Sequence, residues 1–190
     1  MSYYKKYPQI YINQTALKLD KLRDYEYNSQ FDLIITGLQD LSPNEWEYMV
    51  IIPEDKPVLA VYPNHPLANL KNLSLLDAKD ESFIALSKGY SSRKYFDDMC
   101  DLAGFTPKIV LEVDYPLRSE MVQKEYGISF TTILGSKTQI LNGLKFIEIN
   151  YPVNYRIQSI FWRKGRELSQ SALSFRDFMI DYYKKYDPTL

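Results

Sequence analysis

Residues 58–86 read VLAVYPNHPLANLKNLSLLDAKDESFIAL, and this stretch decides the fold class. Val58–Tyr62 is a short apolar and aromatic run of the kind that fills a buried strand, and the prolines that follow it end the strand. Leu70–Asp80 then leads into a second apolar run, Phe83–Leu86. The stretch thus contains a strand, a proline-bracketed crossing and the start of a second α/β unit. This order predicts a protein with two lobes.

Strand and helix signals alternate along the rest of the chain. Apolar runs or alternation predict strands at Tyr7–Gln14, Phe31–Thr36, Met49–Ile52, Ile109–Val113, Ile128–Thr132, Phe146–Tyr151 and Arg156–Arg163. Helical spacing of apolar residues predicts helices at Leu17–Tyr27, Ser92–Ala103, Arg118–Tyr126 and Ser171–Tyr186. This order predicts right-handed crossovers and mostly parallel sheets.

Composition narrows the function. The chain has 190 residues, 45% of them apolar, so it can bury a substantial core. Its formal net charge of −1 and the scatter of its Lys and Arg residues do not suit a protein that holds phosphate backbones by itself. The sequence shows neither a long apolar run nor a charged-then-apolar leader, so we expect no membrane contact and a cytoplasmic location.

Six short motifs follow one another in an order that is known from one protein family. They are YPQIYI (7–12), DLII (32–35), HPLA (65–68), AGFTP (103–107), GISF (127–130) and WRKGRELS (162–169). Over almost its whole length the chain therefore resembles the effector-binding, or substrate-binding, domain of LysR-type transcriptional regulators. The resemblance implies an α/β fold of two Rossmann-like lobes joined by two crossings, similar to type II periplasmic binding proteins. Residues 1–57 and 157–190 would form the first lobe, and residues 58–156 the second.

The start of the chain departs from this family pattern. Full-length members begin with a helix-turn-helix that reads DNA, a linker helix and a first strand of the effector domain. Here Met1–Pro8 looks like the tail of the helix that follows this strand. We therefore expect an N-terminally truncated first lobe and no DNA contact except through the missing helix-turn-helix. A truncated gene or protein and a natural short paralogue that titrates a full-length partner both fit.

A small ligand is expected in the cleft between the lobes, where loops at the carboxyl ends of strands meet. The predicted effector contacts are Thr15, Thr36, Ser87, Gly89, Tyr90, Ser91, Ser92, Arg93, Tyr115, Thr131 and Arg156. The segment Ser87–Arg93 is favoured because it joins a glycine, several hydroxyls and a helix start, which suits an anion.

Several of these assignments have a plainer alternative. Ser91 or Ser92 could cap the helix while Arg93 faces water. Thr131 is of a residue type that is common in strands, and Arg156 could form a surface ion pair. Tyr115 is one of 17 tyrosines.

Catalysis finds little support in the residue inventory. His65 is the only histidine and is expected to be a polar loop residue, so neither a histidine triad nor a metal site is predicted. Cys100 is the only cysteine and is expected to pack as a small apolar group. No cofactor is predicted. A carboxylate enzyme using residues such as Glu112 and Asp114 is the weaker alternative, and a stand-alone solute-binding protein is another.

The sequence thus predicts a sensor rather than an enzyme. A small anionic effector would shift the relative positions of two lobes and of subunits. Because family members pair their effector domains, the resemblance also implies a homodimer or homotetramer.

Overall fold

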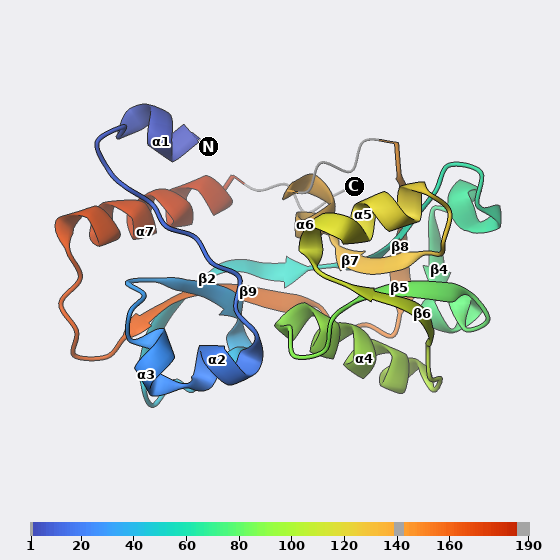
Figure 1. The fold of residues 1–190 in the computed structure, drawn as a ribbon, viewed down its shortest axis with the longest axis horizontal. Coiled ribbons are helices and arrows are strands. Elements are labelled where there is room, and N and C mark those ends of the chain that lie inside the picture. The colour runs from blue at the N-terminus through green and yellow to red at the C-terminus, as the bar shows by residue number, and fades with distance from the viewer. Residues whose placement is uncertain (1, 139–142, 186–190) are drawn as a thin grey trace. The chain divides into compact units, whose positions relative to one another are not determined.

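The computed structural model describes residues 2–138 and 143–185, which fall into two compact α/β units (Figure 1). Unit 1 holds the described residues up to Pro53 and from Ile157 onward, and unit 2 holds those between Glu54 and Arg156. The chain therefore passes from unit 1 into unit 2 within one strand and returns at the start of another.

Unit 1 is built on a three-stranded sheet with the order β1-β9-β2. Its strands are β1 (Ile34–Gly37), β2 (Trp46–Asp55) and β9 (Arg156–Arg163). Its helices are α1 (Ser2–Lys6), α2 (Leu19–Arg23), α3 (Tyr25–Asn28), the 3-10 turn η1 (Leu38–Asp40) and α7 (Gln170–Tyr183). β1 and β9 are antiparallel, with Ile34 opposite Phe161.

Two apolar contacts hold unit 1 together. The core packs Leu22 of α2 against Ile34, Leu41, Trp46 and Phe161. On α1, the buried ring of Tyr3 lies 5.0 Å from the rings of both Phe175 and Phe178, and its hydroxyl donates to Ser174 Oγ at 3.1 Å. The first and last helices of the described chain are thus joined (Figure 1).

Two predictions in unit 1 are wrong. The segment 10–18 belongs to no strand of the described chain, although alternation predicts one at Tyr7–Gln14. Alternation makes a segment suitable for a sheet, but a strand forms only where a neighbour supplies hydrogen bonds. The helix predicted at Leu17–Tyr27 is two short helices, because Asp24 ends α2 and caps α3, its Oδ1 accepting from Glu26 N at 3.0 Å.

Unit 2 contains two sheets. One has the order β4-β8-β3-β7 and the other pairs β5 with β6. The strands are β3 (Pro57–Val61), β4 (Asn72–Ser74), β5 (Ser82–Leu86), β6 (Lys108–Val113), β7 (Ser129–Thr132) and β8 (Lys145–Tyr151). The helices are α4 (Ser91–Ala103), α5 (Tyr115–Gln123), α6 (Ile133–Thr138) and the 3-10 turns η2 (Pro66–Asn69) and η3 (Leu75–Ala78). A single parallel bridge between Phe83 and Ile128 joins the two sheets.

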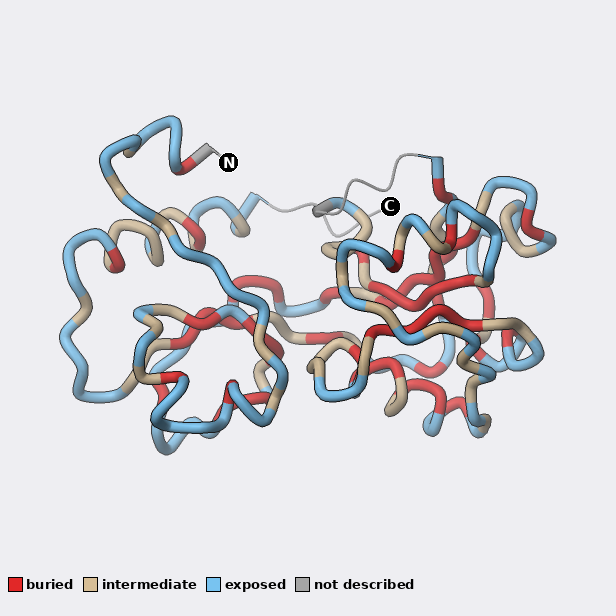
Figure 2. Tube along the Cα trace, viewed as in Figure 1, coloured by how far each residue is buried: buried red, intermediate tan, exposed pale blue. Residues whose placement is uncertain are grey.

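The core of unit 2 forms between its central strands and α4. Figure 2 shows continuous burial along these strands, and every residue of β3 is buried. α4 presents Tyr95, Phe96, Met99 and Cys100 to this core. Gly104 ends the helix with a φ of 83°, which a glycine adopts without strain, so the AGFTP motif is a helix stop.

The expectation of mostly parallel sheets is wrong. β3 runs antiparallel to both of its neighbours, β7 and β8, while β4 with β8 and β5 with β6 are parallel. The alternation of strands and helices does not decide which strands become neighbours. β3 pairs with strands that lie about 70 residues or more further along the chain.

Candidate functional site

The start of α4 is the feature that gathers most of the predicted contacts. Gly89 has a φ of 98°, which allows the chain to turn from β5 into the helix. Tyr90 is the N-cap residue and makes no side-chain capping bond, so neither Ser91 nor Ser92 serves as the cap. Both serines lie in the first turn, where the backbone N–H groups carry a partial positive charge. Their hydroxyls are therefore placed at an electropositive helix end.

Arg156, the first residue of β9, binds these two serines. Its side chain is 5% exposed, so it is not a surface residue. The guanidinium donates to Ser91 Oγ at 2.5 Å and to Ser92 Oγ at 3.3 Å, and lies 5.8 Å from the ring centre of Tyr95. The Tyr95 hydroxyl in turn donates to the carbonyl of Asn154. The first turns of α4 are thus tied to the chain just before β9.

Ser92 also accepts a hydrogen bond from the Tyr115 hydroxyl, at 2.9 Å. A hydroxyl offers two lone pairs and one proton. Because Arg156 and Tyr115 both donate to Ser92 Oγ, the remaining capacity of this group is to donate its own proton. We call Ser91, Ser92, Tyr115 and Arg156 the α4 polar cluster.

The loop between β5 and α4 also lies beside a negative charge. Asp114 Oδ1 accepts from Ser87 Oγ at 3.2 Å. Partial burial, followed by the charge of Asp114, raises the pKa of Tyr90, whose ring lies edge-on to Tyr115 at 5.2 Å. The charge of Asp114 would therefore repel an anion near Ser87 and Tyr90.

Arg93 is engaged inside the protein. It is buried, its Nε donates to Asp97 Oδ1 at 2.9 Å, and its Nη1 donates to Leu86 O at 2.9 Å and to Glu112 Oε1 at 2.6 Å. It therefore neither faces water nor presents an unoccupied fork at the helix start. A direct contact with a ligand stays a prediction that these interactions do not favour.

These contacts predict that Arg93→Ala acts on stability. Its two carboxylate partners are both about two-fifths exposed, so solvent screens the pairs, and we expect the free energy of unfolding to fall by about 2 kcal/mol. Urea denaturation followed by circular dichroism measures this loss. Lys94→Ala, which removes an exposed pair with Asp98 on the same helix, is the matched control and should cost under about 0.5 kcal/mol. Equal losses in the two variants would contradict the structural role of Arg93.

Thr131 lies at the end of β7 and meets an arginine that the sequence prediction missed. Arg118, in the middle of α5, is 5% exposed; its Nη2 donates to Thr131 Oγ1 at 3.3 Å and its Nη1 to Phe130 O at 3.2 Å. Burial lowers the pKa of Arg118 to about 10. The Arg118 guanidinium also lies 5.8 Å from the ring centre of Tyr115, a member of the α4 polar cluster.

Two predicted contacts belong to unit 1. Thr15 is exposed on the segment that forms no strand. Thr36 is nearly buried at the end of β1, and its hydroxyl donates to Asp40 Oδ2 at 2.5 Å, an oxygen that also accepts from Gly37 N at 2.9 Å. The contacts of these two threonines with a ligand stay predictions.

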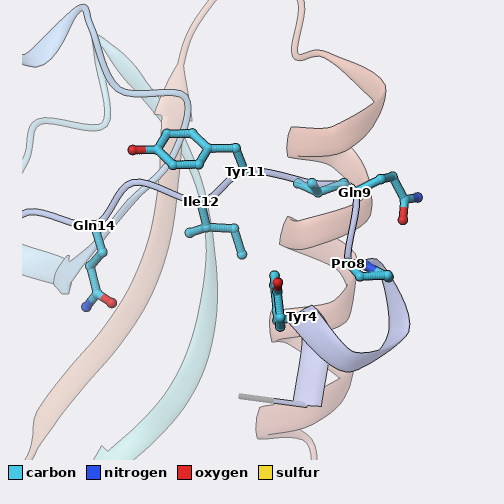
Figure 3. A pocket seen from close by; sticks show the side chains of 7 residues that line it. Tyr4, Pro8, Gln9, Tyr11, Ile12 and Gln14 are labelled. Carbon is cyan, nitrogen blue, oxygen red and sulfur yellow. The ribbon is translucent and has the colours of Figure 1, made fainter.

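A separate hollow of about 480 Å³ occurs in unit 1 (Figure 3). It is lined by Tyr4, Pro8, Gln9, Ile10, Tyr11, Ile12 and Gln14. None of these side chains carries a charge at neutral pH, and none is among the predicted contacts. The hollow therefore offers apolar groups and amides rather than a counter-charge for an anion.

The residues considered for catalysis have structural positions. His65 lies in the loop just before η2, as predicted, and it is buried: its Nδ1 accepts from Leu67 N at 3.2 Å, and its Nε2 lies 3.4 Å from Glu81 Oε2. Cys100 is buried in the core of unit 2, as predicted, and burial raises the pKa of its thiol to about 12. Within residues 2–138 and 143–185, no cluster of three or more His, Cys, Asp or Glu side chains could hold a metal ion.

Comparison with known proteins relates this arrangement to transcriptional regulators. The relatives include the uncharacterized HTH-type transcriptional regulator YybE of Bacillus subtilis (strain 168), which is 26% identical over 97% of this chain. They also include the transcriptional dual regulator GltC of the same organism, 28% identical over 84% of this chain. The matches cover 62% and 53% of these two regulators, so the chain spans only part of their length.

Solved structures show the same fold. The CcmR regulatory domain of Synechocystis PCC6803, in complex with 2-PG, matches 97% of this chain and 88% of its own, with a TM-score of 0.80 and 20% identity. The effector binding domain of QuiR, in complex with shikimate, matches 84% of this chain and 75% of its own, with a TM-score of 0.69 and 28% identity. These likenesses confirm the predicted α/β fold class of the type II periplasmic-binding-protein kind.

Among the helices of the described residues, none combines the length and apolar character that a membrane crossing needs. The family model described as the LysR substrate binding domain matches residues 1–184. The chain belongs to the LysR substrate-binding domain family.

Proposed function

We propose that this chain is the effector-sensing part of a LysR-type regulator and that its α4 polar cluster binds an acidic group of a small molecule. The observation that carries this proposal is the state of Ser92. With both lone pairs of its hydroxyl engaged by Arg156 and Tyr115, Ser92 has a proton left to donate, and its partly exposed position lets an acceptor from solution reach it. A carboxylate or phosphate oxygen at the start of α4 would meet that proton, the helix N–H groups and the nearby charge of Arg156.

The relatives support a sensor over the alternatives. Their names describe transcriptional regulators, which favours sensing over a stand-alone solute-binding protein or a carboxylate enzyme. Effector-binding domains of this fold are known in complex with shikimate and with benzoate, and each of these ligands carries one carboxylate. An anionic effector for this chain agrees with both ligands.

The proposal extends to the whole regulator. The effector would act on DNA through a helix-turn-helix outside this chain, in the cytoplasm and in a homodimer or homotetramer. Binding can shift a regulator only if the ligand prefers one conformation over another. Arg156 offers a route for such a preference, because it stands where the chain returns to unit 1 and its partners are the serines that would meet the ligand.

A thermal-shift screen of the chain against small carboxylates, phosphates, sugars and amino acids tests the ligand class, because a ligand that binds the folded state raises the melting temperature. We expect carboxylates or phosphates to raise it and neutral sugars to leave it unchanged. A response confined to neutral compounds would contradict the proposal.

Ser92→Ala tests the residue that carries the argument. Losing one hydrogen bond to a charged group should weaken binding of a carboxylate found in the screen by about tenfold. Ser171→Ala is a matched control, because Ser171 is the second residue of α7 as Ser92 is of α4. Titration calorimetry on both variants gives the two affinities. Equal affinities in the two variants would remove Ser92 from the site.

A further inference from the structure

Arg118 is a charged group that lies buried on α5. It occupies the buried face of α5 together with Val122, one helical turn away, where an apolar residue would be expected. Two hydrogen bonds of its guanidinium go to neutral oxygens, those of Phe130 and Thr131. A buried cation is costly, and its lowered pKa reports the loss of hydration, although the group remains charged at neutral pH.

Arg118 and Arg156 are linked by two side chains. The ring of Tyr115 contacts the Arg118 guanidinium, while its hydroxyl donates to Ser92 Oγ. Ser92 also accepts from Arg156. One phenol and one serine therefore connect two buried guanidinium groups that come from different elements, α5 and β9.

Each arginine also donates to a hydroxyl side chain at this location. Arg156 donates to Ser92, and Arg118 donates to Thr131. In both cases the hydroxyl accepts from a cation, which leaves its own proton for an acceptor on a ligand. Thr131 thus resembles Ser92 in accepting from a buried arginine, although it lacks a second donor such as the Tyr115 hydroxyl among the bonds described above.

We propose that Arg118 and Thr131 form a second anion-binding position, so that the effector carries two acidic groups, one at Ser92 and Arg156 and the other at Thr131 and Arg118. This inference rests on the proposed function of the α4 polar cluster and adds a requirement to it. Arg118 is then a specificity-determining residue that separates diacids from monoacids.

Matched pairs of probes test this requirement. Titration calorimetry with benzoate against the three benzenedicarboxylates, and with butyrate against succinate, gives the ratio of monoacid to diacid dissociation constants. We expect at least one diacid to bind about tenfold or more tightly than its monoacid, as one added charge-assisted pair would give.

Two variants test whether the ratio of monoacid to diacid dissociation constants depends on Arg118 and Thr131. Thr131→Val keeps the shape of the side chain and removes the hydroxyl, and Arg118→Met removes the charge. Each should bring the ratio close to one while changing monoacid affinity by less than about threefold. Thr132→Val is the control, because the neighbouring hydroxyl of Thr132 accepts from Gly135 N and should leave the ratio unchanged. If Arg118→Met does not fold, Thr131→Val decides.

The outcomes separate the two proposals. Monoacid binding that depends on Ser92, with no diacid preference or with a preference that survives both variants, overturns the second position and leaves the proposed function intact. No binding of any acid overturns both. A diacid preference that disappears in Thr131→Val supports both.

Discussion

Gly127→Ala should lower the free energy of unfolding by about 3 kcal/mol, at the upper end of the usual cost of overpacking. A methyl group added at Gly127 would lie 2.3 Å from the carbonyl oxygen of Ser82 and 3.1 Å from its carbon. These are backbone atoms of β5, and they cannot turn away as a flexible side chain could. Two hydrogen bonds hold the same strand in place, from Ile128 N to Ser82 O at 2.9 Å and from Ile84 N to Ile128 O at 2.8 Å. The GISF motif therefore begins with glycine because two backbones approach closely there.

Urea denaturation of Gly127→Ala and of Gly104→Ala separates the cost of this close approach from the general cost of replacing a glycine. A methyl group at Gly104 meets nothing within 4 Å, so that variant suffers only from its left-handed φ of 83°, at about 1 to 2 kcal/mol. A loss at Gly127 no larger than the loss at Gly104 would show that β5 moves aside easily and would contradict the packing argument.

Arg156→Gln should weaken binding of an acidic ligand by about thirtyfold, which corresponds to about 2 kcal/mol. The change removes a positive charge and the bonds that hold the hydroxyls of Ser91 and Ser92. Arg156→Lys keeps the charge but lacks the planar fork that reaches both serines, so we expect an intermediate loss of about tenfold. Titration calorimetry with the carboxylate found in the screen measures both losses.

The control for these variants is Arg166→Gln in unit 1. Arg166 also uses its guanidinium within the protein, donating to the carbonyls of Ser29 and Phe31, but it lies outside the α4 polar cluster. It should leave the dissociation constant unchanged. If folded Arg156→Gln binds as tightly as the unchanged chain, the cluster is not the site.

The elements that sequence reasoning predicts best are those whose signal is local and complete. Residues of α4 such as Phe96, Met99 and Cys100 recur at helical spacing, and the structure buries all three. The strand Arg156–Arg163 has the predicted limits. A helix supplies its own hydrogen bonds, so its pattern suffices, whereas the segment Tyr7–Gln14 shows that strand alternation says nothing about a partner.

The site shows the same division between local and distant information. Glycine, serines and a helix start are adjacent in sequence, so the segment that begins α4 could be identified. The ion pair of Arg93 with Asp97 joins residues four positions apart on one helix, so the sequence could have predicted it. Its ion pair with Glu112 could not be predicted, because Glu112 lies on a strand, β6, that only the fold brings near. The sequence gives one indication for Arg118, because a cation stands one helical turn before Val122 on the apolar face of α5. Its contact with Thr131 could not be predicted, because only the fold brings the two residues together.

The burial of Cys100 has a practical consequence for following motion in this protein. Its thiol is inaccessible and hardly ionised at neutral pH, so maleimide reagents should pass over the only native cysteine. Cysteines introduced at exposed positions, such as Asp177 in unit 1 and Lys124 in unit 2, could then carry spin labels in an otherwise unaltered chain. The label-to-label distance, recorded with and without a bound acid, would report directly on whether the two units move.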